Sequence, residues 1–267
     1  MTETVLYEIE ERVARITLNR PQSLNAWTPE LGRGYFDRLE EADADPEVRA
    51  IVVTGAGRGF CAGADFEHLQ EVERSGSQPD RDPRPQSLPR SLRKPVIAAI
   101  NGPCAGLGFV MAMMCDIRFA AEGAKLTTAF ARRGLIAEYG LSWVLPRVAG
   151  TSTALDLLLS GRTFLAEEAK RLGVVDRLTA PERAAEEAHA YAVELARNSS
   201  PASMAVIKHQ LYTDLEQDLE QSTAGAVEQM EQSFERPDFR EGVESFVERR
   251  APDFPPLPAT ETQLGPA

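Results

Sequence analysis

The feature that most restricts how this chain can fold is a pattern that occurs twice: an apolar strand, a glycine-rich turn and the start of a helix. Residues 51–54 lead to a turn at residues 59–65, and residues 96–100 lead to a second turn that ends at residues 106–108. Continuously apolar strands with β-branched side chains are typical of a buried parallel sheet. Strands and helices alternate as far as Leu178, which predicts an α/β fold.

Both glycine turns could present backbone N–H groups to a ligand. Glycine is needed where φ is positive or where the backbone approaches another group closely, and the first N–H groups of a helix have no partner inside it. Two such groups aimed at one oxygen would stabilise negative charge that develops there, by about 3–4 kcal/mol for each donor. Taken singly, each turn is more simply explained as a structural connection between a strand and a helix.

The segments before and between the turns have clear local signals. Alternating apolar residues at Val5–Glu10 and Val13–Leu18 predict a β-hairpin. Thr28 followed by proline predicts a helix start, and this helix should end near Asp43. Residues 75–90 hold four prolines and many polar side chains, so we expect a mobile surface loop there.

The pattern changes to helix alone after Pro181. Helices are predicted at residues 182–198, 203–212, 215–234 and 241–250. We therefore expect a mixed core at residues 1–198, which would hold the functional site, and a C-terminal helical region at residues 199–267.

Composition narrows the possible functions. The 267 residues carry a formal net charge of −12, which disfavours nucleic acid as a partner because phosphates require lysine and arginine. Three cysteines and three histidines without ligand spacing predict neither a disulfide framework nor a metal site. The sequence shows no signal peptide and no apolar stretch of membrane-spanning length, so we expect a cytoplasmic protein that does not enter a membrane.

Several longer segments, read together, resemble one known family. They are SLNA at residues 23–26, GFCAGAD at residues 59–65, the stretch at residues 95–116, LLSGR at residues 158–162 and FVERR at residues 246–250. In these segments the chain resembles the crotonase superfamily, also called the enoyl-CoA hydratase/isomerase family. The resemblance spans nearly the whole chain.

This resemblance implies a fold, a ligand and a set of site residues. The expected fold is an α/β spiral of ββα units with a C-terminal helical region used for trimerisation, which gives a homotrimer or a dimer of trimers. The expected ligand is an acyl-CoA thioester, with coenzyme A as part of the substrate and no other cofactor. The oxyanion donors would be the backbone N–H groups of Ala64 and Leu107, the latter in place of a glycine common in the family. Residues expected to line the substrate and CoA groove are Asn25, Ala26, Ala62, Gly63, Asp65, Phe66, Gly106, Gly108, Phe130 and Tyr139. Asp65 is expected to hold its turn rather than to take part in chemistry.

The acidic residues differ from those of the family's hydratases. Those enzymes carry two glutamates at the positions that are Val110 and Phe130 here, and neither of these side chains can transfer a proton. Glu138 instead lies in a loop that resembles that of the Δ3,Δ2-enoyl-CoA isomerases, which use one glutamate. Its neighbours Ile136, Ala137, Leu141 and Trp143 are consistent with an apolar surround that would raise its pKa.

The resemblance therefore favours an isomerase in which Glu138 moves a proton from the α-carbon to the γ-carbon. A hydratase, hydrolase or lyase of the same family is an alternative. A protein that binds acyl-CoA without catalysis is a third possibility, because both usual glutamates are absent.

Overall fold

The computed structural model describes residues 3–76 and 82–257. Its main sheet has the strand order β1-β2-β3-β4-β6-β9. The strands are β1 (Val5–Glu10), β2 (Val13–Leu18), β3 (Ala50–Gly55), β4 (Val96–Ile100), β6 (Ile117–Ala121) and β9 (Arg177–Thr179). Strand β1 pairs antiparallel with β2, and the remaining neighbours pair parallel. The predicted hairpin and the two parallel strands that precede the glycine turns are confirmed.

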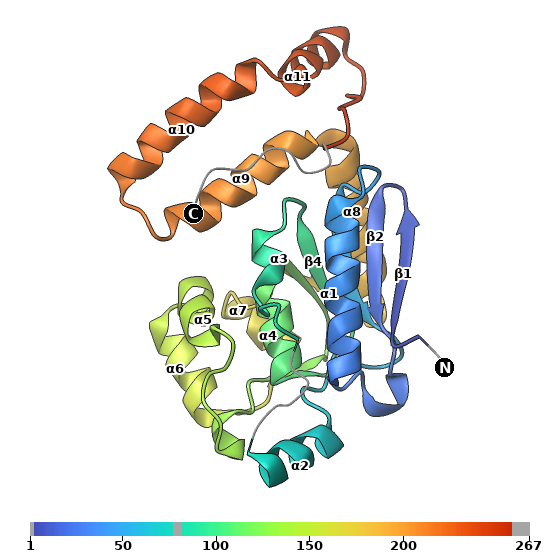
Figure 1. Ribbon diagram of the computed structural model, residues 1–267, viewed down its shortest axis with the longest axis vertical. Coiled ribbons are helices and arrows are strands. Elements are labelled where there is room, and N and C mark those ends of the chain that lie inside the picture. The colour runs from blue at the N-terminus through green and yellow to red at the C-terminus, as the bar shows by residue number, and fades with distance from the viewer. Residues whose placement is uncertain (1–2, 77–81, 258–267) are drawn as a thin grey trace.

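Both faces of this sheet are covered, which is why its central strands are apolar without interruption. Alternate residues of β3 and β4, such as Ile51 and Ala98, pack into one large core with the helices α1 (Pro29–Ala44) and α4 (Leu107–Met114). Their neighbours, such as Val52 and Ile97, form a second core against α8 (Ala184–Asn198). Figure 1 shows α1 and α8 on opposite sides of the strands.

The remaining elements surround the turns that follow the strands. A small sheet joins β5 (Cys104–Ala105), β7 (Lys125–Thr127) and β8 (Phe164–Leu165). The helices of this part are α2 (Phe66–Ser75), α3 (Leu88–Ser91), α5 (Leu141–Ala149), α6 (Thr151–Ser160) and α7 (Ala166–Arg171), with short 3-10 turns at Pro21–Ser23 and Ala131–Arg133. This arrangement is the α/β fold that the sequence predicts.

Helix starts follow their capping residues. The Thr28 hydroxyl accepts a hydrogen bond from the Leu31 N–H at the start of α1. Helix α9 (Pro201–Asp214) begins before the predicted residue 203 because Ser200 caps it. Helix α10 (Leu219–Phe234) begins after the predicted residue 215, since Asp218 and Gln221 form a capping box there. The last helix, α11 (Pro237–Glu248), begins at a proline before the predicted residue 241.

We expected a mobile loop at residues 75–90, and this expectation is wrong for residues 82–90. Residues 77–81 lie outside the described residues. Arg84 forms ion pairs with Asp37 and Glu40 on α1, with N–O distances of 2.7 and 2.8 Å. Gln86 is buried, and α3 follows directly. Polar side chains hold this segment against the core, a possibility that its composition did not reveal.

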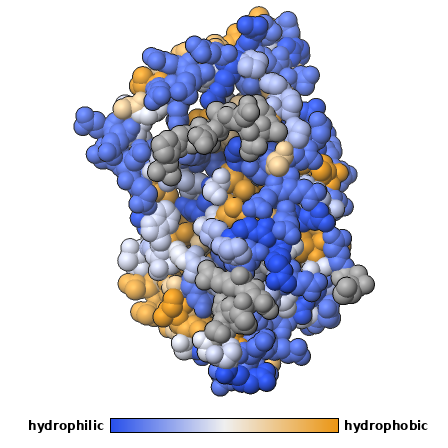
Figure 2. All heavy atoms as spheres, in the orientation of Figure 1, coloured by the Kyte–Doolittle hydropathy of each residue, from blue (hydrophilic) through white to orange (hydrophobic). Residues whose placement is uncertain are grey.

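The C-terminal helices have two different relations to the core. The buried ammonium group of Lys208 on α9 donates to the carbonyls of Pro89 and Lys94 and to the Asp116 carboxylate, so α9 is joined firmly to the core. Helices α10 and α11 instead extend above α9, away from the sheet (Figure 1). They carry exposed apolar side chains, namely Leu219, Val227, Met230, Phe234, Phe239, Val243, Phe246 and Val247. Figure 2 shows such side chains among a predominantly hydrophilic surface.

The predicted trimer stays a prediction, and so does the boundary between core and helical region at residue 198. Within residues 3–76 and 82–257, no helix combines the length and the apolar character that crossing a membrane requires.

Candidate active site

The two glycine turns lie side by side. The Cys61 N–H donates to the Pro103 carbonyl at 3.2 Å, and the Ala105 N–H donates to the Cys61 carbonyl at 3.0 Å. Cys61 and Cys104 also form an isolated parallel bridge. These contacts follow from the parallel pairing of β3 with β4, because strands that run the same way deliver their following turns to the same edge of the sheet.

Glycine is required where the turns meet. A Cβ atom on Gly108 would lie 2.2 Å from the Cys61 carbonyl oxygen, which is far inside van der Waals contact. Gly63 has a φ of +96°, and a Cβ atom there would lie 3.0 Å from the Ala105 carbonyl oxygen. The glycines therefore allow two backbone segments to approach each other more closely than any side chain would permit.

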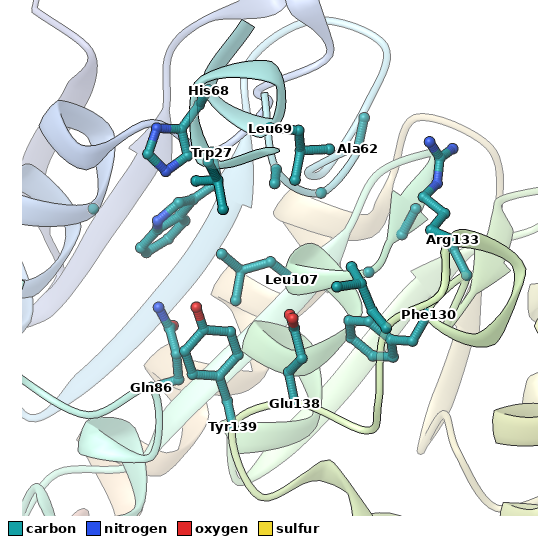
Figure 3. A pocket seen from close by; sticks show the side chains of 18 of the residues that line it. Trp27, Ala62, His68, Leu69, Gln86, Leu107, Phe130, Arg133, Glu138 and Tyr139 are labelled. Carbon is teal, nitrogen blue, oxygen red and sulfur yellow. The ribbon is translucent and has the colours of Figure 1, made fainter. Parts of the chain in front are cut away.

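A cavity of about 360 Å³ opens beside these turns. Its walls come from the two turns, from α1 and α2, from residues 82–86 and from residues 127–139. Figure 3 shows Leu107 between an apolar wall that carries Trp27 and Leu69 and a second wall that carries Glu138 and Tyr139. A volume of this size lies at the lower end of the range typical of small-molecule sites.

Two backbone N–H groups at this cavity are available to a ligand. Ala64 and Leu107 both line it. Leu107 is the first residue of α4, and Ala64 precedes Asp65, the N-cap of α2. Within the described part of the chain, neither N–H donates a hydrogen bond. The predicted donors are thus brought to one cavity, each at a helix start, where the field of the helix favours negative charge.

Glu138 is half-buried, and its carboxylate points into the cavity (Figure 3). Burial raises its pKa, and the carboxylate has no ion-pair partner among the described residues. The local backbone explains its direction, because Tyr139 and Gly140 have φ values of +52° and +79° and turn the chain sharply into α5. The predicted apolar surround is wrong for Ile136, whose side chain is 76% exposed, whereas Leu141 is fully buried.

Asp82 is the other carboxylate among the described lining residues, and its environment is the opposite. Its oxygens accept hydrogen bonds from the Arg84 guanidinium at 2.9 and 2.7 Å, and these bonds lower its pKa. A carboxylate held in this way is a poor proton acceptor. Glu138 is therefore the better candidate for a base.

The predicted groove residues divide into two sets. The cavity is lined by Ala62, Gly63, Phe66, Gly106, Phe130 and Tyr139, whereas Asn25, Ala26, Asp65 and Gly108 lie outside its wall.

The second set supports the first turn. Asn25 is fully buried, and its amide donates to the carbonyls of Ala56 and Gly59. The Arg20 guanidinium bonds the Ala26 carbonyl and pairs with the Asp65 carboxylate at 2.9 Å. As expected, Asp65 holds its turn, because it also caps α2.

Two further positions bear on the chemistry. Val110 is fully buried in the core and does not line the cavity, while Phe130 does.

One lining residue, Gln86, was not predicted from the sequence. It lines the cavity from the segment that was expected to be a mobile loop. A signal was available in Leu88-Pro89, since proline in a first helical turn marks a helix start.

Comparison with known proteins agrees with this geometry. A profile of the enoyl-CoA hydratase/isomerase family matches residues 8–256. A 1,2-epoxyphenylacetyl-CoA isomerase of Escherichia coli is 35% identical, over 95% of this chain and 99% of that protein. The structure of an enoyl-CoA hydratase from Mycobacterium marinum has 52% identity and a TM-score of 0.70, and covers 81% of this chain and 100% of that one. A probable enoyl-CoA hydratase/isomerase from Mycobacterium abscessus has 32% identity and a TM-score of 0.88, with 95% of this chain and 99% of that chain covered. The chain belongs to the enoyl-CoA hydratase/isomerase family of the crotonase superfamily.

Proposed function

We propose that this protein is an acyl-CoA isomerase that moves a proton along a 3-enoyl-CoA to give the conjugated 2-enoyl-CoA. The observation that carries the proposal is one carboxylate, Glu138, which has no partner within residues 3–76 and 82–257 and shares a cavity with the N–H groups of Ala64 and Leu107, which donate no hydrogen bond within these residues. A 1,3 proton shift needs one group that can both take and return a proton, together with donors for the charge that develops in between.

The steps balance with these groups alone. The Ala64 and Leu107 N–H groups donate to the thioester oxygen, and the Glu138 carboxylate takes a proton from the α-carbon. The electron pair of that C–H bond shifts toward the thioester oxygen and gives a dienolate. Protonated Glu138 then delivers the proton to the γ-carbon, the double bond moves to the 2,3 position and the carboxylate is regenerated. No electrons enter or leave the substrate during these steps. The thioester carbonyl takes up the negative charge of the intermediate, and coenzyme A serves as part of the substrate.

The raised pKa of Glu138 suits this double role. A carboxylate with a pKa nearer to neutrality is a stronger base toward a carbon acid, and its protonated form is still acidic enough to return the proton. Asp82 lacks this property because Arg84 holds it ionised.

Hydration is the second candidate, since several similar proteins have hydratase in their names. The two positions that carry glutamates in the family's hydratases are apolar here, and this disfavours it: Val110 is buried in the core and Phe130 forms part of the cavity wall. Glu138 alone would have to position a water molecule and also protonate carbon.

The test is to incubate the protein separately with 3-hexenoyl-CoA and 2-hexenoyl-CoA and to follow the products by mass. We expect 3-hexenoyl-CoA to convert into an isomer of unchanged mass that absorbs as a conjugated thioester. In deuterated water, exchange of protonated Glu138 with solvent while the dienolate is bound would place deuterium in the product, because the carboxylate carries no proton between turnovers. A gain of one water on 2-hexenoyl-CoA would instead support the hydratase. Absence of any turnover together with tight acyl-CoA binding would support a binding protein.

We also propose that the chain acts as a homotrimer or a dimer of trimers. The support is the run of exposed apolar side chains on α10 and α11, which extend from the core without a covering element in the described chain. Sedimentation of the full chain tests this, and a monomer at micromolar concentration would contradict it.

A further inference from the structure

The cavity has one exposed side and one buried end. In Figure 3, Arg133 and Trp27 lie on opposite sides of Leu107. Arg133 is exposed, whereas Trp27 is 9% exposed and its neighbour Phe36 is 1% exposed, and all of them line the cavity. Coenzyme A is large and charged, so it needs solvent, and the side near Arg133 provides it. An acyl group that is bound at the donors of Leu107 and Ala64 therefore points toward Trp27.

The backbone of Trp27 is paired with the turn that carries one of the two donors. The Trp27 N–H donates to the Gly63 carbonyl at 2.7 Å, and the Asp65 N–H donates to the Trp27 carbonyl at 2.9 Å. Trp27 and Ala64 thus form an isolated parallel bridge. Because the two residues are neighbours across this bridge, the indole of Trp27 forms a wall at a fixed position relative to the thioester oxygen.

Gly32 holds the indole in place. A Cβ atom on Gly32 would lie 2.6 Å from Cζ2 and 2.9 Å from Cε2 of Trp27, so the indole rests directly on the backbone of α1. A glycine inside a helix lowers stability relative to alanine, and contact with the indole explains this one. The ring also meets Tyr35 and Phe36 nearly edge to face, with centroids 5.9 and 6.0 Å away. These contacts leave the indole little room to move aside for an acyl chain.

The cavity wall next to Phe36 is charged. The Arg84 guanidinium lies over the Phe36 ring, 5.3 Å from its centroid, and pairs with the Asp82 carboxylate at 2.7 Å. Both charged residues line the cavity. An alkyl chain that reached this ion pair would take water from it without supplying a hydrogen-bond partner. The part of the cavity that favours methylene groups is therefore short, and it ends at Trp27 and Phe36.

We infer that Trp27, seated on Gly32, is the specificity-determining residue of this cavity and restricts it to short-chain acyl-CoA thioesters. Methylene groups near the thioester are buried against the indole. Those farther along a longer chain meet the indole or the ion pair of Arg84 and stay outside the apolar surface. The inference deepens the proposed function, on which it rests, because it places the thioester oxygen at Ala64 and Leu107.

Binding of saturated thioesters tests this restriction without any turnover. The probes are butanoyl-CoA, hexanoyl-CoA and decanoyl-CoA, with dissociation constants measured by titration calorimetry. Each buried methylene raises affinity about fourfold. In the parent protein we therefore expect a gain of about tenfold from butanoyl-CoA to hexanoyl-CoA, but a gain of less than about threefold from hexanoyl-CoA to decanoyl-CoA.

Variants of the two tryptophans locate the restriction. Trp27→Leu opens space at the buried end, so decanoyl-CoA should bind at least about tenfold more tightly than hexanoyl-CoA. Trp27→Phe removes less volume and should raise this ratio about fourfold over that of the parent protein. Trp143→Leu is the matched control, because Trp143 is half-buried but does not line the cavity, and it should keep the pattern of the parent protein.

A glycine variant tests the seat of the indole. Gly32→Ala places a methyl group against Trp27, so the thermal midpoint should fall by about 2–4 °C or more and hexanoyl-CoA should bind severalfold more weakly. In the Trp27→Leu protein the same change should no longer lower the midpoint, since alanine favours the helix. Gly225→Ala on α10, where a Cβ atom meets nothing within 4 Å, is the control and should cause no loss.

The restriction is overturned if the parent protein already binds decanoyl-CoA more tightly than the expected limit, or if Trp27→Leu and Trp27→Phe leave the ratio of the parent protein unchanged. Failure of the proposed function looks different, because Trp27 would still control the chain-length ratio while 3-hexenoyl-CoA is not isomerised. Conversely, isomerisation with a ratio that does not respond to Trp27 would remove the restriction alone.

Discussion

The two parts of the cavity that would do the chemistry are built in opposite ways. The glycine turns are locked together: a Cβ atom on Gly102 would lie 2.1 Å from the Arg58 carbonyl oxygen, and one on Gly108 would lie 2.2 Å from that of Cys61. The glycines of the loop that carries Glu138 are not crowded. A Cβ atom on Gly134 would meet nothing within 4 Å, and one on Gly140 would meet only a Met114 methyl group at 3.9 Å.

This difference matches two different tasks. Donors that stabilise charge work best when they are fixed before the charge develops, because no reorganisation is then needed during the reaction. A base that serves both the α-carbon and the γ-carbon must reach two positions, and rotation about the side-chain bonds of a glutamate allows this. We therefore expect substitutions in the turns to change the folded structure, and substitutions in the loop to change the chemistry.

The largest expected effect is on turnover, from Glu138→Gln. The substitution keeps the shape of the side chain but removes the base, so isomerisation should fall by about 10²–10⁴-fold. The assay follows the absorbance of the conjugated thioester formed from 3-hexenoyl-CoA. Glu122→Gln, an exposed position that does not line the cavity, is the matched control and should keep full activity. Retained activity in Glu138→Gln would mean that the loop does not supply the base.

Two glycine variants, one in a glycine turn and one in the loop that carries Glu138, compare how closely the surrounding atoms pack against each position. Gly108→Ala places a methyl group against a backbone oxygen, so the free energy of unfolding should fall by about 2–3 kcal/mol or more. Gly134→Ala meets no atom, and only the positive φ of +71° is unfavourable, so its loss should be about 1 kcal/mol. Urea denaturation gives both values. Equal losses would show that the two glycines are equally constrained by their surroundings.

The glycine turns could be predicted from the sequence because their constraints are local. An apolar strand, a glycine and a helix start follow each other directly, and parallel pairing brings the two turns together. The position of Glu138 could be predicted only through resemblance to a family. Nothing in the residues around it specifies a cavity: of the neighbours expected to surround it, Leu141 is buried but Ile136 is exposed.

The segment at residues 82–86 was missed for a different physical reason. Its composition is that of a loop, and its order depends on ion pairs between Arg84 and residues more than forty positions away in the sequence, on α1. Long-range polar contacts of this kind leave no periodic pattern in the chain. The burial of Gln86 could not be predicted for the same reason, because it depends on the ion pairs of Arg84.

A smaller effect is expected when the ion pairs of Arg84 are removed. Arg84→Met breaks the ion pairs with the exposed Asp37 and Glu40 and also leaves the Asp82 carboxylate, whose side chain is 9% exposed, without its partner. The free energy of unfolding should therefore fall by about 1–2 kcal/mol. Because residues 82–86 form part of the cavity wall, KM should rise severalfold while kcat changes little. Arg74→Met, at the end of α2, is the control. A large fall in kcat with unchanged KM would mean that Arg84 acts on the reaction itself.

The smallest expected effect is a pH dependence of stability that has opposite signs at the two carboxylates of the cavity. Burial raises the pKa of Glu138, so the folded chain holds this proton more tightly than the unfolded chain does. Its stabilising contribution is complete below the ordinary glutamate pKa of about 4.3 and is lost as pH rises through the raised value. Glu138→Gln should therefore gain stability relative to the parent protein as pH rises through this window.

Asp82 should behave in the reverse way. The hydrogen bonds from Arg84 lower its pKa, so its contribution is present above the ordinary aspartate pKa of about 3.9 and is lost as pH falls through the lowered value. Asp82→Asn should thus be more destabilising at neutral pH than in acid. Thermal midpoints of both variants and of the parent protein, measured from acid to neutral pH, give the two slopes. If both slopes had the same sign, the two carboxylates would share one environment, and the assignment of Glu138 alone as the base would lose its physical support.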